Sequence, residues 1–101
     1  MTAYLFVRAE VPDADRQEFD RWSETEHLPD AKAAIDVLTA WRGWSDIPPG
    51  LHVAAYEISD LFQARRVLGS SAIDELIAEF DCVWQGRVSG TRQIVGVEQL
   101  I

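Results

Sequence analysis

Side chains that alternate between apolar and polar positions predict β-strands at four places along the chain. The expected strands cover residues 3–11, 37–45, 51–58 and 91–101. In the first strand, the side that runs from Leu5 to Val11 is uniformly apolar, whereas the opposite side mixes aromatic and charged residues. This difference predicts a half-buried strand whose sheet has one face against a core.

Apolar residues at helical spacing predict a helix after the first strand. Asp13 or Asp15 can cap this helix, which is expected to run to about Thr25. Pro29 should stop the helix and turn the chain, because proline lacks the N–H group that a helix interior needs. Residues 27–37 are then a short turn with a helix, or an irregular link.

Two helical pieces lie between the third and fourth strands. The first begins at Ser59 or Asp60, and the second spans residues 73–84 behind a capping box of Ser71 and Asp74. The resulting order is β-α-β-β-α-β. It predicts one ferredoxin-like α+β domain over residues 1–101, with a four-stranded antiparallel sheet and the helices on one face.

The other face of the sheet is expected to be too apolar to remain exposed to water. Residue parity assigns to it Tyr4, Phe6, Arg8, Leu38, Ala40, Arg42, Trp44, His52, Ala54 and Tyr56. The chain is also 48% hydrophobic, which is more than one small core easily buries. Both observations predict a homodimer that pairs through the sheet faces.

The charge balance disfavours several kinds of partner. The net charge is −8, with no cluster of lysine or arginine, so neither nucleic acid nor an anionic membrane surface is an expected partner. No apolar run is long enough for a membrane helix. The N-terminus is typical of a strand and not of a signal peptide. One cysteine, Cys82, forms no internal disulfide and suits a reducing cytoplasm, which is the expected location.

One segment carries a family resemblance. Residues 22–29 read W-x-x-x-E-H-x-P, and together with the following strands they resemble the dimeric α+β barrel superfamily, near its EthD-like group. The order of elements covers the whole chain, whereas the motif covers only residues 19–29. The resemblance implies two ferredoxin-like subunits packed sheet to sheet, each with a pocket between helices and sheet. Relatives include cofactor-free monooxygenases, polyketide cyclases, muconolactone isomerase and haem enzymes, so the resemblance implies a scaffold more than a reaction.

His27 is the first candidate for chemistry. Near a helix C-terminus its charged form would be favoured by the helix dipole and by Glu26. It can be a general acid or base at the mouth of a pocket. It can equally be a capping histidine bonded to backbone carbonyls. The resemblance implies that its ring faces the cavity.

His52 and Tyr56 share one side of the third strand, about 13 Å apart at roughly 3.3 Å per residue. With Arg42 and Trp44 they could line the barrel, where Tyr56 or Arg42 would polarise or orient a carbonyl group. The alternative places His52 in solvent after the turn and Tyr56 at the dimer interface.

Aromatic residues are the remaining candidates. Phe6, Trp22 and Trp44, with Glu26 at the rim, could form an aromatic-walled pocket for a flat ligand. Core filling is the alternative, especially for Trp22 and Trp84. A metal centre of His27, His52 and Glu26 has suitable residue types, but the spacing matches no linear motif. We expect neither a metal nor a cofactor.

Two functions stay open. One is a cofactor-free enzyme of isomerase, cyclase or monooxygenase type that acts on a small aromatic or polyketide-like acid or ketone, with His27 as acid/base. The other is a non-catalytic dimer that binds a small ligand or has an accessory role. The two differ in whether His27 is essential.

Overall fold

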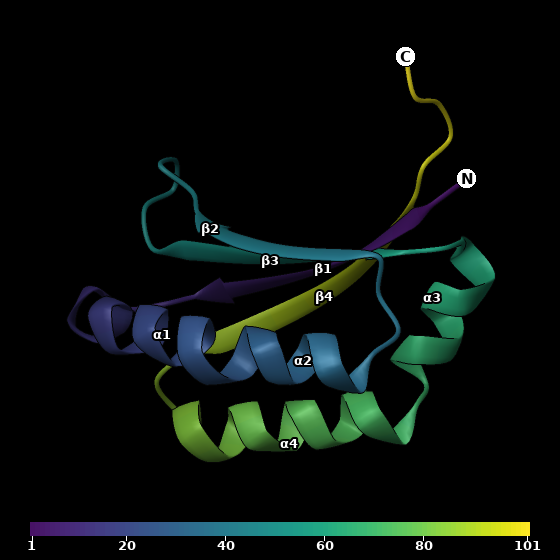
Figure 1. Cartoon of the computed structure of the whole chain (residues 1–101). Coiled ribbons are helices and arrows are strands. Elements are labelled where there is room, and N and C mark those ends of the chain that lie inside the picture. Colours follow the sequence, from purple (N-terminus) through teal and green to yellow (C-terminus); the bar gives the residue numbers. More distant parts are fainter.

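The computed structural model covers residues 1–101 and forms two layers, a four-stranded sheet and a layer of helices (Figure 1). The strands are β1 (Ala3–Glu10), β2 (Thr39–Trp44), β3 (Leu51–Ile58) and β4 (Ser89–Gly96). The helices are α1 (Arg16–Trp22), α2 (Leu28–Ala34), α3 (Leu61–Leu68) and α4 (Ser71–Trp84). All neighbouring strands are antiparallel, in the order β2-β3-β1-β4. The predicted α+β ferredoxin-like fold is confirmed.

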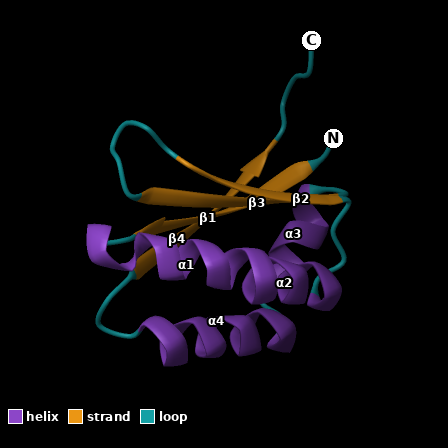
Figure 2. Ribbon diagram, turned by 60° about the vertical axis from the view of Figure 1, so that its left-hand side comes forward, coloured by secondary structure: helices purple, strands orange, loops and turns teal.

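All the helices pack on one face of the sheet, as both ribbon views show (Figure 2). The side chains beneath them form two buried clusters. One cluster is mostly aliphatic, with Leu5, Ile58 and Leu76 among its members, and it also contains Tyr56. The other lies at the opposite end of the sheet and is mostly aromatic, with Phe19, Phe80 and Trp84 at its centre. No helix is both long and apolar enough to cross a membrane.

The strand register corrects the predicted composition of the exposed sheet face. Leu5 lies opposite Tyr56, and Ala9 lies opposite His52, so these residues all point toward the helices. The same correction applies to the even-numbered residues of β2, since Trp44 lies opposite His52. The residues wrongly placed on the exposed face are Ala40, Arg42, Trp44, His52, Ala54 and Tyr56. Tyr4, Phe6 and Arg8 lie on that face as predicted. The other residues that it carries are Trp41, Val53, Ala55, Gln93 and Val95.

The first helix does not end near Thr25. The chain continues through a π-helical turn, Ser23–His27, directly into α2. In this turn the N–H of Leu28 donates to the carbonyl of Ser23, five residues back. Pro29 therefore does not stop the helix. It lies in the first turn of α2, where the widened turn before it accommodates a ring that would clash in a regular helix.

The helix starts also differ from the prediction. Neither Asp13 nor Asp15 caps α1 through its side chain. At α4 the cap is Ser70, whose hydroxyl accepts from the N–H of Ile73, so the predicted capping box was one residue too late. Asp60 caps α3 as predicted.

Candidate functional site

A small internal space between sheet and helices is divided into two lobes. The lobes share four lining residues, Val7, His27, Tyr56 and Phe80. The outer lobe lies between α2, α4 and the sheet and encloses about 30 Å³, or about 430 Å³ of unfilled space when its open mouth is included. The inner lobe encloses about 10 Å³ against α1 and β3, close to the room that one water needs.

A larger hollow lies where β1 ends, beside the β2–β3 loop. It has a volume of about 670 Å³, but it is wide open to solvent and neither histidine lines it. Its lining is also mostly polar or proline-rich. The two lobes are therefore the better candidate for a site that combines apolar enclosure with titratable groups.

His27 lies at the junction of the two lobes. Its imidazole stacks on the indole of Trp22, with ring centres 4.4 Å apart and planes inclined by 17°. Its Nδ1 atom is buried and has no hydrogen-bond partner. Burial lowers the pKa of His27 to about 4, against an opposing effect of the Asp30 carboxylate. This direction is opposite to the one predicted from a helix C-terminus, because the helix continues past His27 and most of the ring is shielded from water.

The π-helical turn determines which residue faces the space. In a regular helix, the residue that follows Trp22 on the same face is Glu26, four positions later. The turn Ser23–His27 adds one residue, so His27 takes that place and Glu26 is exposed. Glu26 lines neither lobe, contrary to its predicted place at the rim. The same turn buries Ser23 against the inner lobe.

His52 is 3% exposed and lines the inner lobe. Its ring meets the rings of Trp44 and Phe19 edge to face, at 4.9 and 5.0 Å. Its Nε2 atom is buried without a hydrogen-bond partner. Burial, followed by the nearby charge of Arg42, lowers the pKa of His52 to about 4. The alternative of a solvated His52 is excluded.

Tyr56 lines both lobes and is 3% exposed. Burial raises the pKa of its hydroxyl group to about 12, so Tyr56 is a neutral hydrogen-bond donor at neutral pH. Because it points toward the helices, it does not lie at the exposed sheet face, where the alternative reading had placed it. Tyr56 and His27 thus face the same enclosed space.

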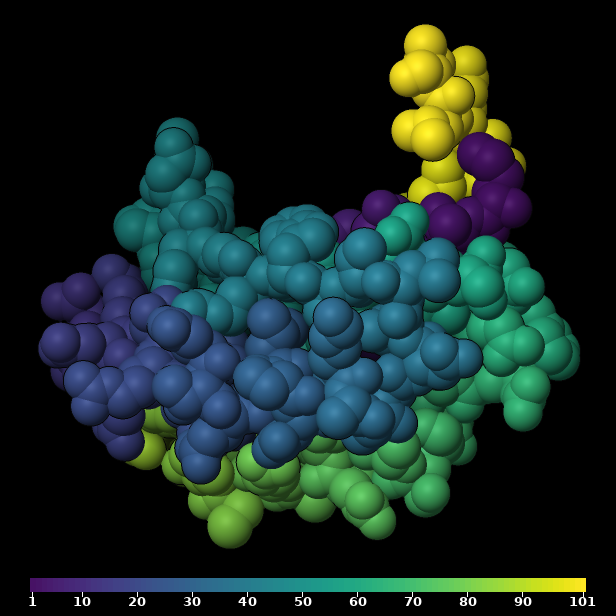
Figure 3. Space-filling view, in the orientation of Figure 1, coloured from purple at the N-terminus to yellow at the C-terminus, as the bar shows by residue number.

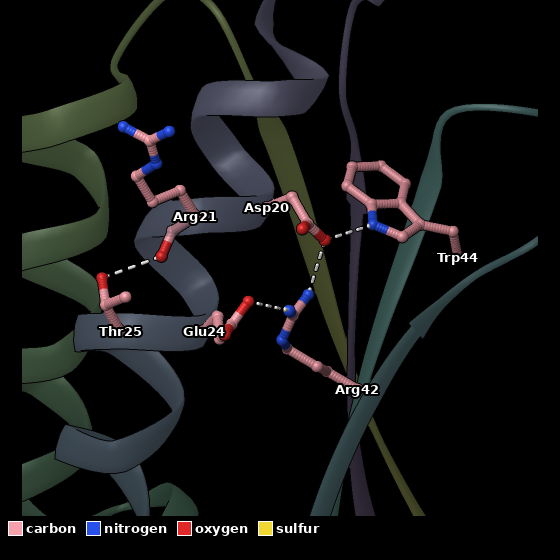
Figure 4. Close-up of polar contacts among 6 residues, drawn as sticks. All are labelled: Asp20, Arg21, Glu24, Thr25, Arg42 and Trp44. Atoms are coloured by element: carbon pink, nitrogen blue, oxygen red, sulfur yellow. Dashed lines mark hydrogen bonds and ion pairs between the residues drawn. The ribbon is translucent and has the colours of Figure 1, made fainter.

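Arg42 and Trp44 belong to a polar bridge outside the lobes (Figure 4). The Asp20 carboxylate accepts hydrogen bonds from Trp44 Nε1 at 2.7 Å and from Arg42 Nη1 at 2.8 Å. Both hydrogen bonds lower the pKa of Asp20, and the bond from Trp44 has the larger effect. Glu24 lies 3.5 Å from Arg42 Nη2. The bridge fastens β2 to α1, and Arg42 lines neither lobe.

Nearby in the π-helical turn, the hydroxyl of Thr25 donates to the carbonyl of Arg21 at 2.8 Å (Figure 4). A side chain of the turn thus bonds a backbone acceptor in the last turn of α1.

The structure brings together only part of the predicted site. His27, His52 and Tyr56 line the internal space, and the indole of Trp22 stacks on the His27 ring. Phe6 lies on the opposite face of the sheet, where its ring stacks on Tyr4, so it was wrongly assigned to the same pocket. Trp22 and Trp84 are buried in the core, as the alternative reading predicted.

Sequence reasoning missed Ser23 and Arg92, which each line one lobe, and Phe80, which lines both. Ser23 lies four residues after Phe19 and four before His27, a helical spacing that could have indicated a shared face. Arg92 alternates with Ile94 in the last strand, which could have placed both on the side of the helices. No group of three or more His, Cys, Asp or Glu side chains is arranged to hold a metal ion.

The fold is shared with proteins of known structure. No protein-family model and no curated protein sequence matches the chain. An EthD family protein from Bacillus halodurans superposes with a TM-score of 0.75 at 13% identity, over 96% of this chain and 99% of the other. The chain therefore shares the ferredoxin-like α+β fold of this EthD family protein.

Two further structures show the range of proteins with this fold. A NIPSNAP family protein from Agrobacterium tumefaciens has a TM-score of 0.71 at 14% identity, over 94% of this chain and 91% of the other. SnoaB, a cofactor-independent oxygenase from Streptomyces nogalater, has a TM-score of 0.67 at 10% identity, over 99% and 96%. At these identities the similarity establishes the fold and not the reaction.

Proposed function

We propose that the protein is a cofactor-free enzyme that removes a proton from a carbon atom next to a carbonyl group in a small, flat substrate. The observation that carries this proposal is His27. Its imidazole is neutral at neutral pH, has a buried nitrogen without a partner, and lies between two lobes that it shares with Tyr56. A neutral imidazole in an apolar enclosure can accept a proton.

Two groups of the chain take part in the proton transfer: one accepts the proton, and the other stabilises the negative charge that forms on the substrate. One ring nitrogen of His27 takes the proton, and the electron pair of the C–H bond moves to the carbonyl oxygen, which becomes an enolate. The Tyr56 hydroxyl is neutral and can donate a hydrogen bond to that oxygen. Trp22 fixes the orientation of the His27 ring, and it is a positioning residue because it lines neither lobe.

The fate of the enolate distinguishes the reaction types. Reprotonation at another atom gives an isomerase, attack on a second carbonyl gives a cyclase, and reaction with dioxygen as the oxidant gives a monooxygenase. The last type is supported by the fold shared with SnoaB, which is a cofactor-independent oxygenase. All three types share the first step, so a test of that step does not require the natural substrate.

Hydrogen–deuterium exchange tests the proton transfer. Small aromatic β-ketoesters would be incubated in D₂O with the protein, and loss of the acidic C–H signal would be followed by NMR. The wild type should accelerate exchange, and His27→Gln should reduce that acceleration by about a hundredfold. Ligand binding without acceleration in the wild type would favour the non-catalytic binding protein instead.

We also propose that a second copy of the chain covers the exposed face of the sheet. Support comes from the apolar residues there, including Tyr4, Phe6 and Trp41, of which Trp41 is 49% exposed. The β2–β3 loop and the C-terminal segment both project on this side, at opposite ends of the sheet (Figure 3). They also carry exposed apolar side chains, Ile47 and Leu100. A twofold-related copy would bury these surfaces together.

A further inference from the structure

The outer lobe contains a single charged side chain. Arg92 lies on β4, opposite Val7, and therefore on the side of the sheet that the helices cover. Its side chain lines the outer lobe, and the residue is exposed on the edge strand. The other polar groups of the lobe, His27 and Tyr56, are both neutral at neutral pH. Arg92 thus places one positive charge at the mouth of an otherwise apolar space.

Five of the eight arginines of the chain form no ion pair, and Arg92 is the one of these five that lines a lobe. Arg16, Arg42 and Arg87 each form an ion pair with a carboxylate. Arg92 forms no ion pair, although the chain has 17 acidic residues against nine basic ones. Its charge is nevertheless felt inside the lobe, where it acts on the imidazole of His27. A guanidinium group without a carboxylate partner is free to bind an anion from solution.

We propose that the outer lobe selects a flat, apolar ligand that is an anion at neutral pH, with its carboxylate or comparable acidic oxygen paired to Arg92. This inference rests on the proposed function, because it places the apolar body of the substrate against Phe80 and its reacting carbon near His27. The protein as a whole carries a net charge of −8, which repels anions. Preference for an anion therefore has to come from a local charge, and Arg92 is the one that lines the lobe.

Two aromatic probes of the same shape test the charge selection. 2-Naphthoate is an anion and 2-naphthamide is neutral, and both would be titrated against the protein by tryptophan fluorescence and NMR. The wild type should bind the acid about tenfold more tightly than the amide. Arg92→Gln should reverse that preference, because the acid is then repelled by the net negative charge of the protein with no local positive charge to offset it. The affinity for the neutral amide should stay the same.

Three further variants make the test specific. Arg65→Gln removes the same charge from α3, away from both lobes, and should leave both affinities unchanged. Arg92→Lys keeps the charge without the planar fork and should retain part of the preference. Gly90 lines the mouth, and a Cβ built on it lies 3.8 Å from the Phe80 ring. Gly90→Leu should therefore obstruct the lobe and lower the affinity for both probes by the same factor.

The outcomes separate this inference from the proposed function. If both probes bind the wild type equally and Gly90→Leu weakens both, the lobe is a binding site but Arg92 selects no anion, and only the present inference is overturned. If neither probe binds at millimolar concentration, the lobe is not a binding site and the proposed function is overturned with it. An acid preference that survives in Arg92→Gln would also overturn the assignment to Arg92.

Discussion

The imidazole of His27 lies flat against the indole of Trp22, five residues earlier in the chain, with 4.4 Å between ring centres. Five residues is the spacing of a π-helical turn, and the turn Ser23–His27 supplies it. The turn has two consequences. It directs His27 inward, where burial keeps the ring neutral, and it leaves Glu26 in solvent.

Removing the Trp22 ring should destabilise the fold and should also change the pKa of His27. Trp22 is 7% exposed and contacts Phe19, Phe80 and Trp84. Trp22→Ala should lower the free energy of unfolding by about 3–5 kcal/mol, as for other buried large aromatic residues. Urea denaturation measures this loss. Phe62→Ala, at a residue that is 67% exposed, is the control and should change stability by no more than about 0.5 kcal/mol.

Acidification should destabilise the protein through its two buried histidines. The pKa of each is lowered from 6.5 to about 4 in the folded state. The unfolded state therefore binds more protons between these pH values, and stability falls as the pH drops from 6.5 toward 4. The loss approaches roughly 3 kcal/mol for each imidazole at the lower end.

Carboxylates titrate in the same range, so the contribution of one histidine is best measured as a difference. Urea denaturation of the wild type and of His52→Gln at pH 7 and pH 4.5 gives this difference. The variant should lose less stability on acidification than the wild type. Equal losses would mean that His52 is not held neutral by its surroundings.

The bridge around Asp20 should contribute modestly to stability. Its side chain is 41% exposed, so solvent screens the ion pair with Arg42. Asp20→Asn should cost about 1 kcal/mol, because the bonds to Arg42 and Trp44 lose their charge-assisted character. A double-mutant cycle with Arg42→Gln measures the coupling between the two residues. A coupling of zero would show that the bridge contributes nothing.

A charge placed on the exposed sheet face should prevent pairing of two copies. Trp41→Glu puts a carboxylate on the apolar part of that face, opposite Ala55, and is expected to give a monomer of 11.4 kDa. Size-exclusion chromatography with light scattering measures the mass, and the wild type should have twice that value. A wild-type monomer at micromolar concentration would contradict the proposed dimer.

Much of the fold could be predicted from local patterns. The period-two strands and the helix from Ile73 to Trp84 were visible because each has one clearly apolar side. The orientation of β3 was not, since both of its sides are apolar. One side carries Ala54 and Tyr56, and the other carries Val53 and Ala55. Only the register with β1 decides which side faces the helices.

The candidate site was harder to predict because it depends on a helical irregularity. A spacing of four residues predicts Glu26 beside Trp22. Nothing in the neighbouring sequence indicates that the helix contains the extra residue of a π-helical turn. Pro29 in fact suggested a helix end, although it lies within α2. Arg92 was missed because it comes from a strand 65 residues later than His27, and only the sheet brings the two to one lobe.

The protonation of His27 is the most direct test of this account. NMR of the ¹⁵N-labelled imidazole, followed from pH 8 to pH 3.5, reports the pKa of this ring. We predict a neutral ring at pH 6 and a pKa of about 4, because the ring is buried against Trp22. In Trp22→Ala the pKa should move back toward 6.5. A wild-type pKa at or above 6.5 would identify a solvated or capping histidine and would contradict the role of His27 as a neutral base.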